Sequence, residues 1–173
     1  REIASLQVFL VRDEFNSKNA KFVLKSGDSS INLSSNFIEN IYDNNHWNLA
    51  LRVKPLTYPY AGNVTNTKPN YSVDLYAVNH NMDELVHEVN LSANINFASG
   101  SAFLSKPKRI FVGAHLENFR GTVQERSDIM VGGCRAWLDY IDDSAIKQHN
   151  KDVSNFGEQE SYRSSNMFTL NNK

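Results

Sequence analysis

Trp47-Asn-Leu-Ala-Leu-Arg-Val-Lys54 carries the plainest structural signal in this chain, because its side chains alternate in character with a period of two residues. One set is large and apolar: Trp47, Leu49, Leu51 and Val53. The other set is polar or small: Asn48, Ala50, Arg52 and Lys54. Successive side chains of a β-strand point to opposite faces of the sheet, so this pattern predicts a strand. We expect its apolar face in the core, with Trp47 as a packing anchor, and its other face to be wet or semi-wet.

The same period returns downstream of this strand. Residues 71–78 alternate Val73, Leu75 and Ala77 with Asp74, Tyr76 and Val78. A polar turn at residues 79–83 follows, and residues 84–92 are interpreted as the return strand of a hairpin. A short helix is the alternative for residues 84–92, because Leu85, Val86 and Val89 also fit a helical stripe.

Three more strands are predicted upstream. Residues 2–12 form a nearly continuous apolar run, which is typical of a core strand buried on both faces. Residues 21–25 predict a second strand that ends at the polar turn 26–29, and residues 30–37 contain a third, short strand.

The C-terminal part of the chain, residues 108–150, predicts strands at 110–112, 122–123 and 129–131. Cys134 is expected to be a small buried residue near the end of the last of these strands. One short helix follows: Asp142, Asp143 or Ser144 can cap its first amides, and Ala145, Ile146, His149 and Val153 recur at helical spacing. Together these segments predict an all-β, two-sheet antiparallel β-sandwich with one short helix near the C-terminus.

Several of these segments resemble the concanavalin A-like lectin/glucanase superfamily, and within it the laminin-G-like jelly roll. The resemblance lies in residues 45–53 and 71–78, the Gly-Thr-Val turn at 121–123, Arg-Ala-Trp at 135–137 and Asp-Asp-Ser-Ala-Ile at 142–146. Residues 124–128 and the pair Gly132-Gly133 lengthen the single strand that the family has at this point. The resemblance implies a jelly-roll strand order and a role in virion-associated or extracellular proteins, such as bacteriophage tail and appendage proteins.

The length of 173 residues suits one hydrophobic core. We expect one domain over residues 1–157 and a polar tail or linker over 158–173, within a larger chain or assembly. The 18 Lys and Arg against 19 Asp and Glu give a formal net charge of −1, so no overall field attracts nucleic acid. An apolar run of the ~18 residues that a membrane span needs is absent, so no membrane partner is expected.

Catalytic and metal-binding patterns are missing from the sequence. Glycosidases of the resembled superfamily carry a Glu-x-Asp-x-x-Glu or similar pattern on one strand, and this chain has none. His-Glu-x-x-His and Gly-x-Ser-x-Gly are also absent, and residues 98–102 resemble a loop rather than a nucleophile turn. Asp43-Asn44-Asn45 is interpreted as an Asn-rich turn, with a calcium site as the alternative. We therefore expect no enzymatic activity, no cofactor and no metal.

Two loops combine aromatic, amide and charged side chains. The candidate ligand-binding residues are Tyr58, Tyr60, Asn63 and Asn66 in the first loop and Asn118 and Arg120 in the second. An aromatic face can pack on the apolar side of a sugar ring while amides bond its hydroxyl groups. The resulting hypothesis is a non-catalytic module, in a virion or extracellular setting, that binds a glycan or a neighbouring protein subunit. The alternatives are a glycoside hydrolase of the same fold and a pure scaffold domain without a small ligand.

Overall fold

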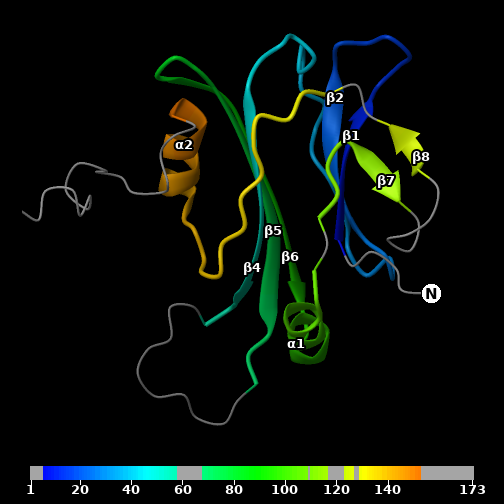
Figure 1. Ribbon diagram of the computed structural model, residues 1–173, viewed down its shortest axis with the longest axis vertical. Helices are drawn as coiled ribbons and strands as arrows, with labels where there is room; N and C mark the ends of the chain where they lie inside the picture. Colours follow the sequence, from blue (N-terminus) through cyan, green and yellow to red (C-terminus); the bar gives the residue numbers. More distant parts are fainter. Residues whose placement is uncertain (1–5, 58–67, 109, 117–122, 127–128, 153–173) are drawn as a thin grey trace, which may run out of the picture.

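The chain is described here by a computed structural model, which covers residues 6–57, 68–108, 110–116, 123–126 and 129–152, with 114–116 and 123–126 represented by their backbone alone. Eight strands and two helices lie in these residues (Figure 1). Sheet A has the order β1 (Leu6–Arg12), β2 (Ala20–Ser26), β3 (Asn32–Ser34). Sheet B has the order β4 (Trp47–Pro55), β5 (Tyr71–Asn81), β6 (Glu84–Ile95). The remaining elements are α1 (Phe97–Ser105), the pair β7 (Ala114–Leu116) and β8 (Val123–Arg126), and α2 (Asp143–Lys151).

The two three-stranded sheets are antiparallel and pack face to face. The core between them joins the inward side chains of β2 to those of β5: Ala20, Phe22 and Leu24 with Val73, Leu75 and Ala77. Burying a Val, Leu or Phe side chain stabilises a fold by about 1.5–3 kcal/mol, so this interface is the main source of stability. The predicted β-rich class is therefore confirmed, while the jelly-roll strand order stays a prediction.

Helix α2 covers the opposite face of sheet B. Ile146 of α2 packs with Tyr76 and Val78 of β5 in a second buried cluster. The layers in Figure 1 follow one another from left to right as α2, sheet B and sheet A, with β7 and β8 at the right. Strand β5 is buried on both faces because it is the middle strand of a middle layer.

Several local predictions are confirmed. Strands β2 and β3 lie where the apolar segments placed them, and β5 and β6 form the predicted hairpin, so the helical alternative for residues 84–92 is wrong. Met82, in the turn between them, has a φ of 54°. The Asp142 side chain caps α2 by accepting a hydrogen bond from the Ala145 amide at 2.8 Å. Strand β8 includes Val123, the described residue of the strand predicted at 122–123.

Other predictions are wrong. Strand β1 is not buried on both faces, because Val8 on its inner face and Val11 on its outer face are exposed, and β2 is its one partner among the described strands. Residues 110–112 and 129–131 are not strands, since they form no ladder with another segment. Cys134 is exposed in an irregular segment rather than buried in a strand.

A second helix is present where the sequence predicted a loop. Helix α1 begins after Asn96, whose side chain accepts a hydrogen bond from the Ser99 amide at 2.8 Å. Its Gly100 packs directly against Tyr71. The residues of this helix, which include Phe97, Phe103 and Leu104, have no amphipathic pattern, so the predicted fold of one helix is corrected to two. Neither helix is long and apolar enough to cross a membrane, and none other lies in the described residues.

Candidate functional site

The two sheets are closed along one side and open along the other. Strand β3 of sheet A lies against β6 of sheet B. Because β1 and β4 are at the other ends of the two facing sheets, their outer edges are both on the opposite side. An edge strand presents a row of unpaired backbone N–H and C=O groups. We call this side of the molecule, bounded by β1 and β4, the open side.

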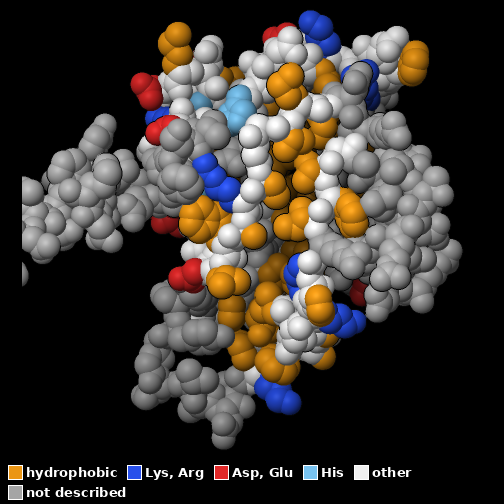
Figure 2. Space-filling view, in the orientation of Figure 1, with side chains coloured by type: hydrophobic (Ala, Val, Ile, Leu, Met, Phe, Trp, Pro, Cys, Tyr) orange, Lys and Arg blue, Asp and Glu red, His pale blue; other side chains and the backbone are white. Residues whose placement is uncertain are grey.

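Large apolar side chains face inward at the open side and are nevertheless exposed. Leu49 and Leu51 lie opposite Ala77 and Leu75, so they belong to the core face of sheet B, as the sequence predicted. They are 49% and 43% exposed, and no strand in the described part of the chain pairs with the outer edge of β4. Figure 2 shows hydrophobic side chains gathered in a strip down the middle of the molecule. Both leucines face the core, as predicted. The prediction that they are buried there is wrong.

The same pattern occurs across the gap on sheet A. Val8 of β1 lies opposite the fully buried Leu24 and is 36% exposed. The open side therefore has apolar residues from both sheets, beside two edges that form no ladder with another described strand. Another strand could pair with a sheet edge of this kind and cover the core-facing side chains that remain exposed beside it.

Two apolar segments that form no β-ladder within the described residues also have exposed side chains. The exposed large side chains in them are Ile110, Phe111 and Val112, and Ile129, Met130 and Val131. The segments approach each other, since the side chain of Ile129 lies beside Gly113. Soluble monomers seldom expose contiguous apolar patches larger than a few hundred Å², and larger ones mark interaction sites.

A polar network lies beneath α2 on the other face of sheet B. Arg52, which is 8% exposed, donates from Nε to Asp74 at 2.6 Å and from Nη1 to Asp143 at 2.6 Å and to the Ile141 carbonyl at 3.0 Å. The predicted wet face of β4 is thus buried at this position, which corrects the sequence-based expectation. Burial lowers the pKa of Arg52, but the Asp143 hydrogen bond and the nearby negative charges outweigh it and raise the pKa overall.

Tyr76 extends this network away from Arg52. Its hydroxyl donates to Glu88, and Glu88 also forms an ion pair with Lys147 of α2 at 3.1 Å. Burial, followed by the Glu88 hydrogen bond, raises the pKa of Tyr76 well above its ordinary value, while the Tyr76 hydroxyl holds the pKa of Glu88 low. Each of these ionisable groups already has a partner, so the network anchors α2 and provides no free acid, base or nucleophile.

Histidines gather where the end of α2 meets β4 and β5. Asn150 donates from Nδ2 to His46 Nδ1 at 3.1 Å, and its Oδ1 lies 2.7 Å from His80 Nδ1. His149 is buried and stacks on Trp137 with ring centroids 5.7 Å apart. Its Nε2 is buried without a hydrogen-bond partner among the described residues. Within that same part of the chain, no group of three His, Cys, Asp or Glu residues is arranged to hold a metal ion.

Trp47 is a packing residue, as predicted. It is partly buried against the core, meets Phe22 edge to face and stacks on His87 with ring centroids 5.8 Å apart. Asp43, in the Asn-rich turn before it, forms an exposed ion pair with Lys18 at 3.7 Å.

The predicted ligand-binding residues all lie outside the described residues, so their arrangement stays a prediction. They are Tyr58, Tyr60, Asn63, Asn66, Asn118 and Arg120. Sequence reasoning missed the exposure of Leu49 and Leu51 and the burial of Arg52. One signal could have found the burial of Arg52, since Asp74 stands at the matching position of the next predicted strand.

A comparison of this chain with protein-family models, with curated proteins and with solved structures finds no match. The functional interpretation therefore rests on the geometry of the described residues.

Proposed function

We propose that this chain is a non-catalytic protein-interaction module that binds an extended segment of another protein along its open side. The observation that carries the proposal is the pair of sheet edges at β1 and β4, with which no strand of the described residues pairs, and the inward-facing Val8, Leu49 and Leu51 exposed beside them. The proposed setting is a larger virion-associated or extracellular protein, in which the module has a jelly-roll fold and contacts a neighbouring subunit.

An extended strand is the partner that suits this surface best. Its backbone can pair with the free N–H and C=O groups of β4, which gives affinity. Its alternate side chains can cover Leu49 and Leu51, which follow the same two-residue period. A helix would cover the leucines but would leave the backbone edge unpaired, because its own N–H and C=O groups are already bonded.

A selection from displayed random ten-residue peptides tests this proposal. We expect the recovered peptides to alternate apolar and polar residues, and their binding to be lost in Leu51→Lys. Val86→Lys is the matched control, because Val86 is a similarly exposed apolar residue on β6, away from the open side. Binding that is lost equally in both variants, or peptides that bind Leu51→Lys as well as the unmodified chain, would contradict the proposal.

A further inference from the structure

The two ends of helix α2 are held on sheet B by different kinds of contact. At its start, Ile146 packs in the second buried cluster, and Asp143 pairs with the buried Arg52. At its end, the buried side chains are those of His149 and Asn150. The end of α2 therefore depends on polar contacts. Histidine takes part in them, and its ordinary pKa of about 6.5 lies within the range in which surroundings change from neutral to mildly acidic.

Asn150 joins two histidines, one before β4 and one on β5. Its Nδ2 donates to His46 Nδ1 at 3.1 Å, and its Oδ1 lies 2.7 Å from His80 Nδ1. The same Nδ2 lies 3.4 Å from the His46 carbonyl oxygen, which can only accept, so this end of the amide is the donor. His46 Nδ1 must then accept, and only an unprotonated nitrogen can do so. Protonation of His46 breaks this bond, whereas a protonated His80 can still donate to Asn150.

His149 opposes protonation for a different reason, which is burial. It is 8% exposed and stacks on Trp137, and its Nε2 has no hydrogen-bond partner among the described residues. Burial, and then the charge of Arg135, lower the pKa of His149. The carbonyl end of α2 attracts positive charge, but more weakly than the burial of an unpaired charge opposes it. Docking of α2 is therefore strongest above the ordinary pKa of 6.5 and weakens as the pH falls below it.

The carboxylates beside this end of α2 already have partners. Glu88 pairs with Lys147 at 3.1 Å, and Asp83 pairs with Lys151 at 3.4 Å. In the described residues, the titratable and charged side chains around the end of α2 are His46 before β4, Tyr76 and His80 on β5, Asp83 in the hairpin turn, Glu88 on β6, Arg135 before α2, and His149, Lys147, Lys151 and Asp152 of α2 and its cap. Histidine is the residue type among these whose ordinary pKa lies between about 5 and 8.

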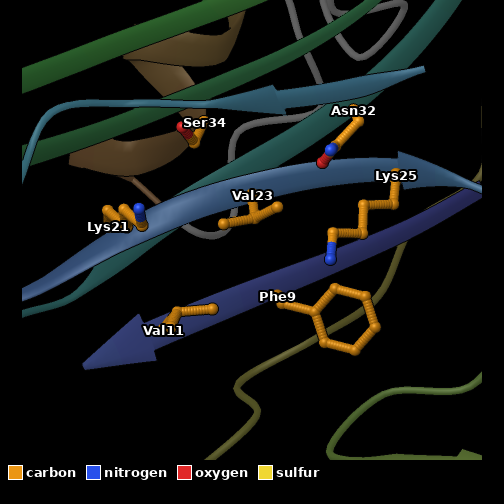
Figure 3. Close-up of a pocket in the computed structure, with 7 residues that line it drawn as sticks. All are labelled: Phe9, Val11, Lys21, Val23, Lys25, Asn32 and Ser34. Carbon is orange, nitrogen blue, oxygen red and sulfur yellow. The ribbon is translucent and has the colours of Figure 1, made fainter. Parts of the chain in front are cut away.

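The core between the two sheets does not change its charge in this range. Its members among the described residues are apolar, and they include no histidine and no carboxylate. The charged side chains of β2, Lys21 and Lys25, lie on the outer face of sheet A, away from this core (Figure 3). A fall from about pH 8 to pH 5 therefore adds charge at the end of α2 and leaves the main source of stability intact.

We infer that the contact between the end of α2 and sheet B is a pH-sensitive switch: protonation of His46 and His149 releases residues 147–152 from sheet B, while the two sheets stay packed. The carrying observation is that Asn150 requires an unprotonated His46 in the docked state, directly beside the buried His149. This switch is independent of the proposed peptide binding, since α2 covers the face of sheet B that lies opposite the core.

Amide hydrogen exchange at about pH 8 and pH 5 tests the inference, with rates expressed as protection factors so that the intrinsic effect of pH on exchange is removed. We expect the protection of residues 147–152 to fall by about tenfold or more at the lower pH, the factor that one pKa unit of linkage gives. The protection of β5 should change by less than about twofold, because the core stays packed. Unchanged protection of residues 147–152, or an equal fall in β5, would overturn the inference.

Variants assign the effect to the two histidines. Combining His46→Gln with His149→Gln should abolish the fall in protection, because a glutamine oxygen can accept the Asn150 hydrogen bond without titrating. Each substitution alone should remove part of it. His87→Gln is the matched control and should keep the full fall, because His87 stacks on Trp47 on the core face of sheet B. A fall that persists in the double variant, or that is also lost in His87→Gln, would refute the assignment.

Discussion

Single residues of this chain show how burial changes the role of a charged side chain. Arg52 lies in a strand where its sequence position suggests contact with water, yet its guanidinium is enclosed by Asp74, Asp143 and the rings of Tyr76 and Tyr140. A buried charge is stable only when it is paired and hydrogen-bonded. The stability lost when a partner of Arg52 is replaced should therefore increase with the burial of that partner.

The three carboxylates Asp74, Asp143 and Asp43 therefore form a graded series. Asp74→Asn should destabilise the fold by about 3–5 kcal/mol, because it breaks a buried pair and leaves Arg52 undercompensated. Asp143→Asn should cost less, since the Asp143 side chain is half exposed. Asp43→Asn should change stability by less than about 1 kcal/mol, because both members of its pair with Lys18 are exposed. Urea unfolding measures all three, and equal losses would contradict the buried network.

His149 predicts a dependence of stability on pH. Burial, and then the charge of Arg135, hold the pKa of His149 below its ordinary value of 6.5. The unfolded chain therefore takes up this proton at a higher pH than the folded chain does. The contribution of His149 to stability is complete above its ordinary pKa of 6.5, and it is lost as the pH falls from there toward the lower folded-state pKa.

The comparison with His149→Gln tests this dependence. Between about pH 8 and pH 5 the unmodified chain should lose more unfolding free energy than the variant loses. The other charged groups near this end of α2 are Arg135, Glu88, Lys147 and the pair Lys151 and Asp83, together with His46 and His80, and they remain in both proteins. Identical pH profiles for the two proteins would exclude a titrating role for His149.

At the scale of elements, the two helices differ in what specifies them. Helix α2 is specified locally: Asp142 caps it, the Ala145 backbone hydrogen bond holds the pKa of Asp142 low, and Ile146 lies on its buried face. Helix α1 is specified by tertiary contact, because its Gly100 is the residue that permits close approach to Tyr71 of β5.

Gly100→Ala tests the tertiary origin of α1. A Cβ at this position would lie 2.9 Å from Tyr71 Cβ and closer still to the ring, so either the helix or Tyr71 must shift. We expect a loss of about 1–3 kcal/mol by overpacking, although alanine is favoured over glycine in a helix by about 1 kcal/mol. Gly132→Ala is the control, since nothing lies within 4 Å of the added atom. A stabilised Gly100→Ala protein in thermal unfolding would show that the contact is loose.

At the scale of the whole molecule, the main feature is that two packed sheets are closed on the β3 and β6 side and open on the β1 and β4 side. The unequal burial of facing leucines follows from this. Leu51 and Leu75 lie directly opposite each other in neighbouring strands and on the same face, but Leu75 is 1% exposed and Leu51 is 43% exposed.

These two leucines form a matched pair for alanine substitution. Leu75→Ala should cost about 2–5 kcal/mol, because it leaves a cavity in the core. Leu51→Ala should cost less than about 1 kcal/mol, since much of its side chain already contacts water. Denaturant unfolding of both variants is the measurement. Equal losses would mean that the open side is covered in solution, and would remove the basis for the proposed peptide binding.

The sequence by itself determined the strands of sheets A and B, the β5–β6 hairpin and the capped start of α2. These follow from two-residue alternation, turn chemistry and a capping side chain, all of which act between residues that are close along the chain. The predicted ligand-binding residues stay predictions because they lie outside the described residues: Tyr58, Tyr60, Asn63, Asn66, Asn118 and Arg120.

Only the tertiary structure decided which faces of β4 are covered. Alternation assigns Leu51 and Arg52 to opposite faces, but burial depends on what packs over each face. Helix α2, about ninety residues later in the chain, covers Arg52, and no strand lies beyond β4 to cover Leu51 among the described residues. Coverage is a property of distant segments, and a local pattern of apolar and polar residues has no information about where those segments lie.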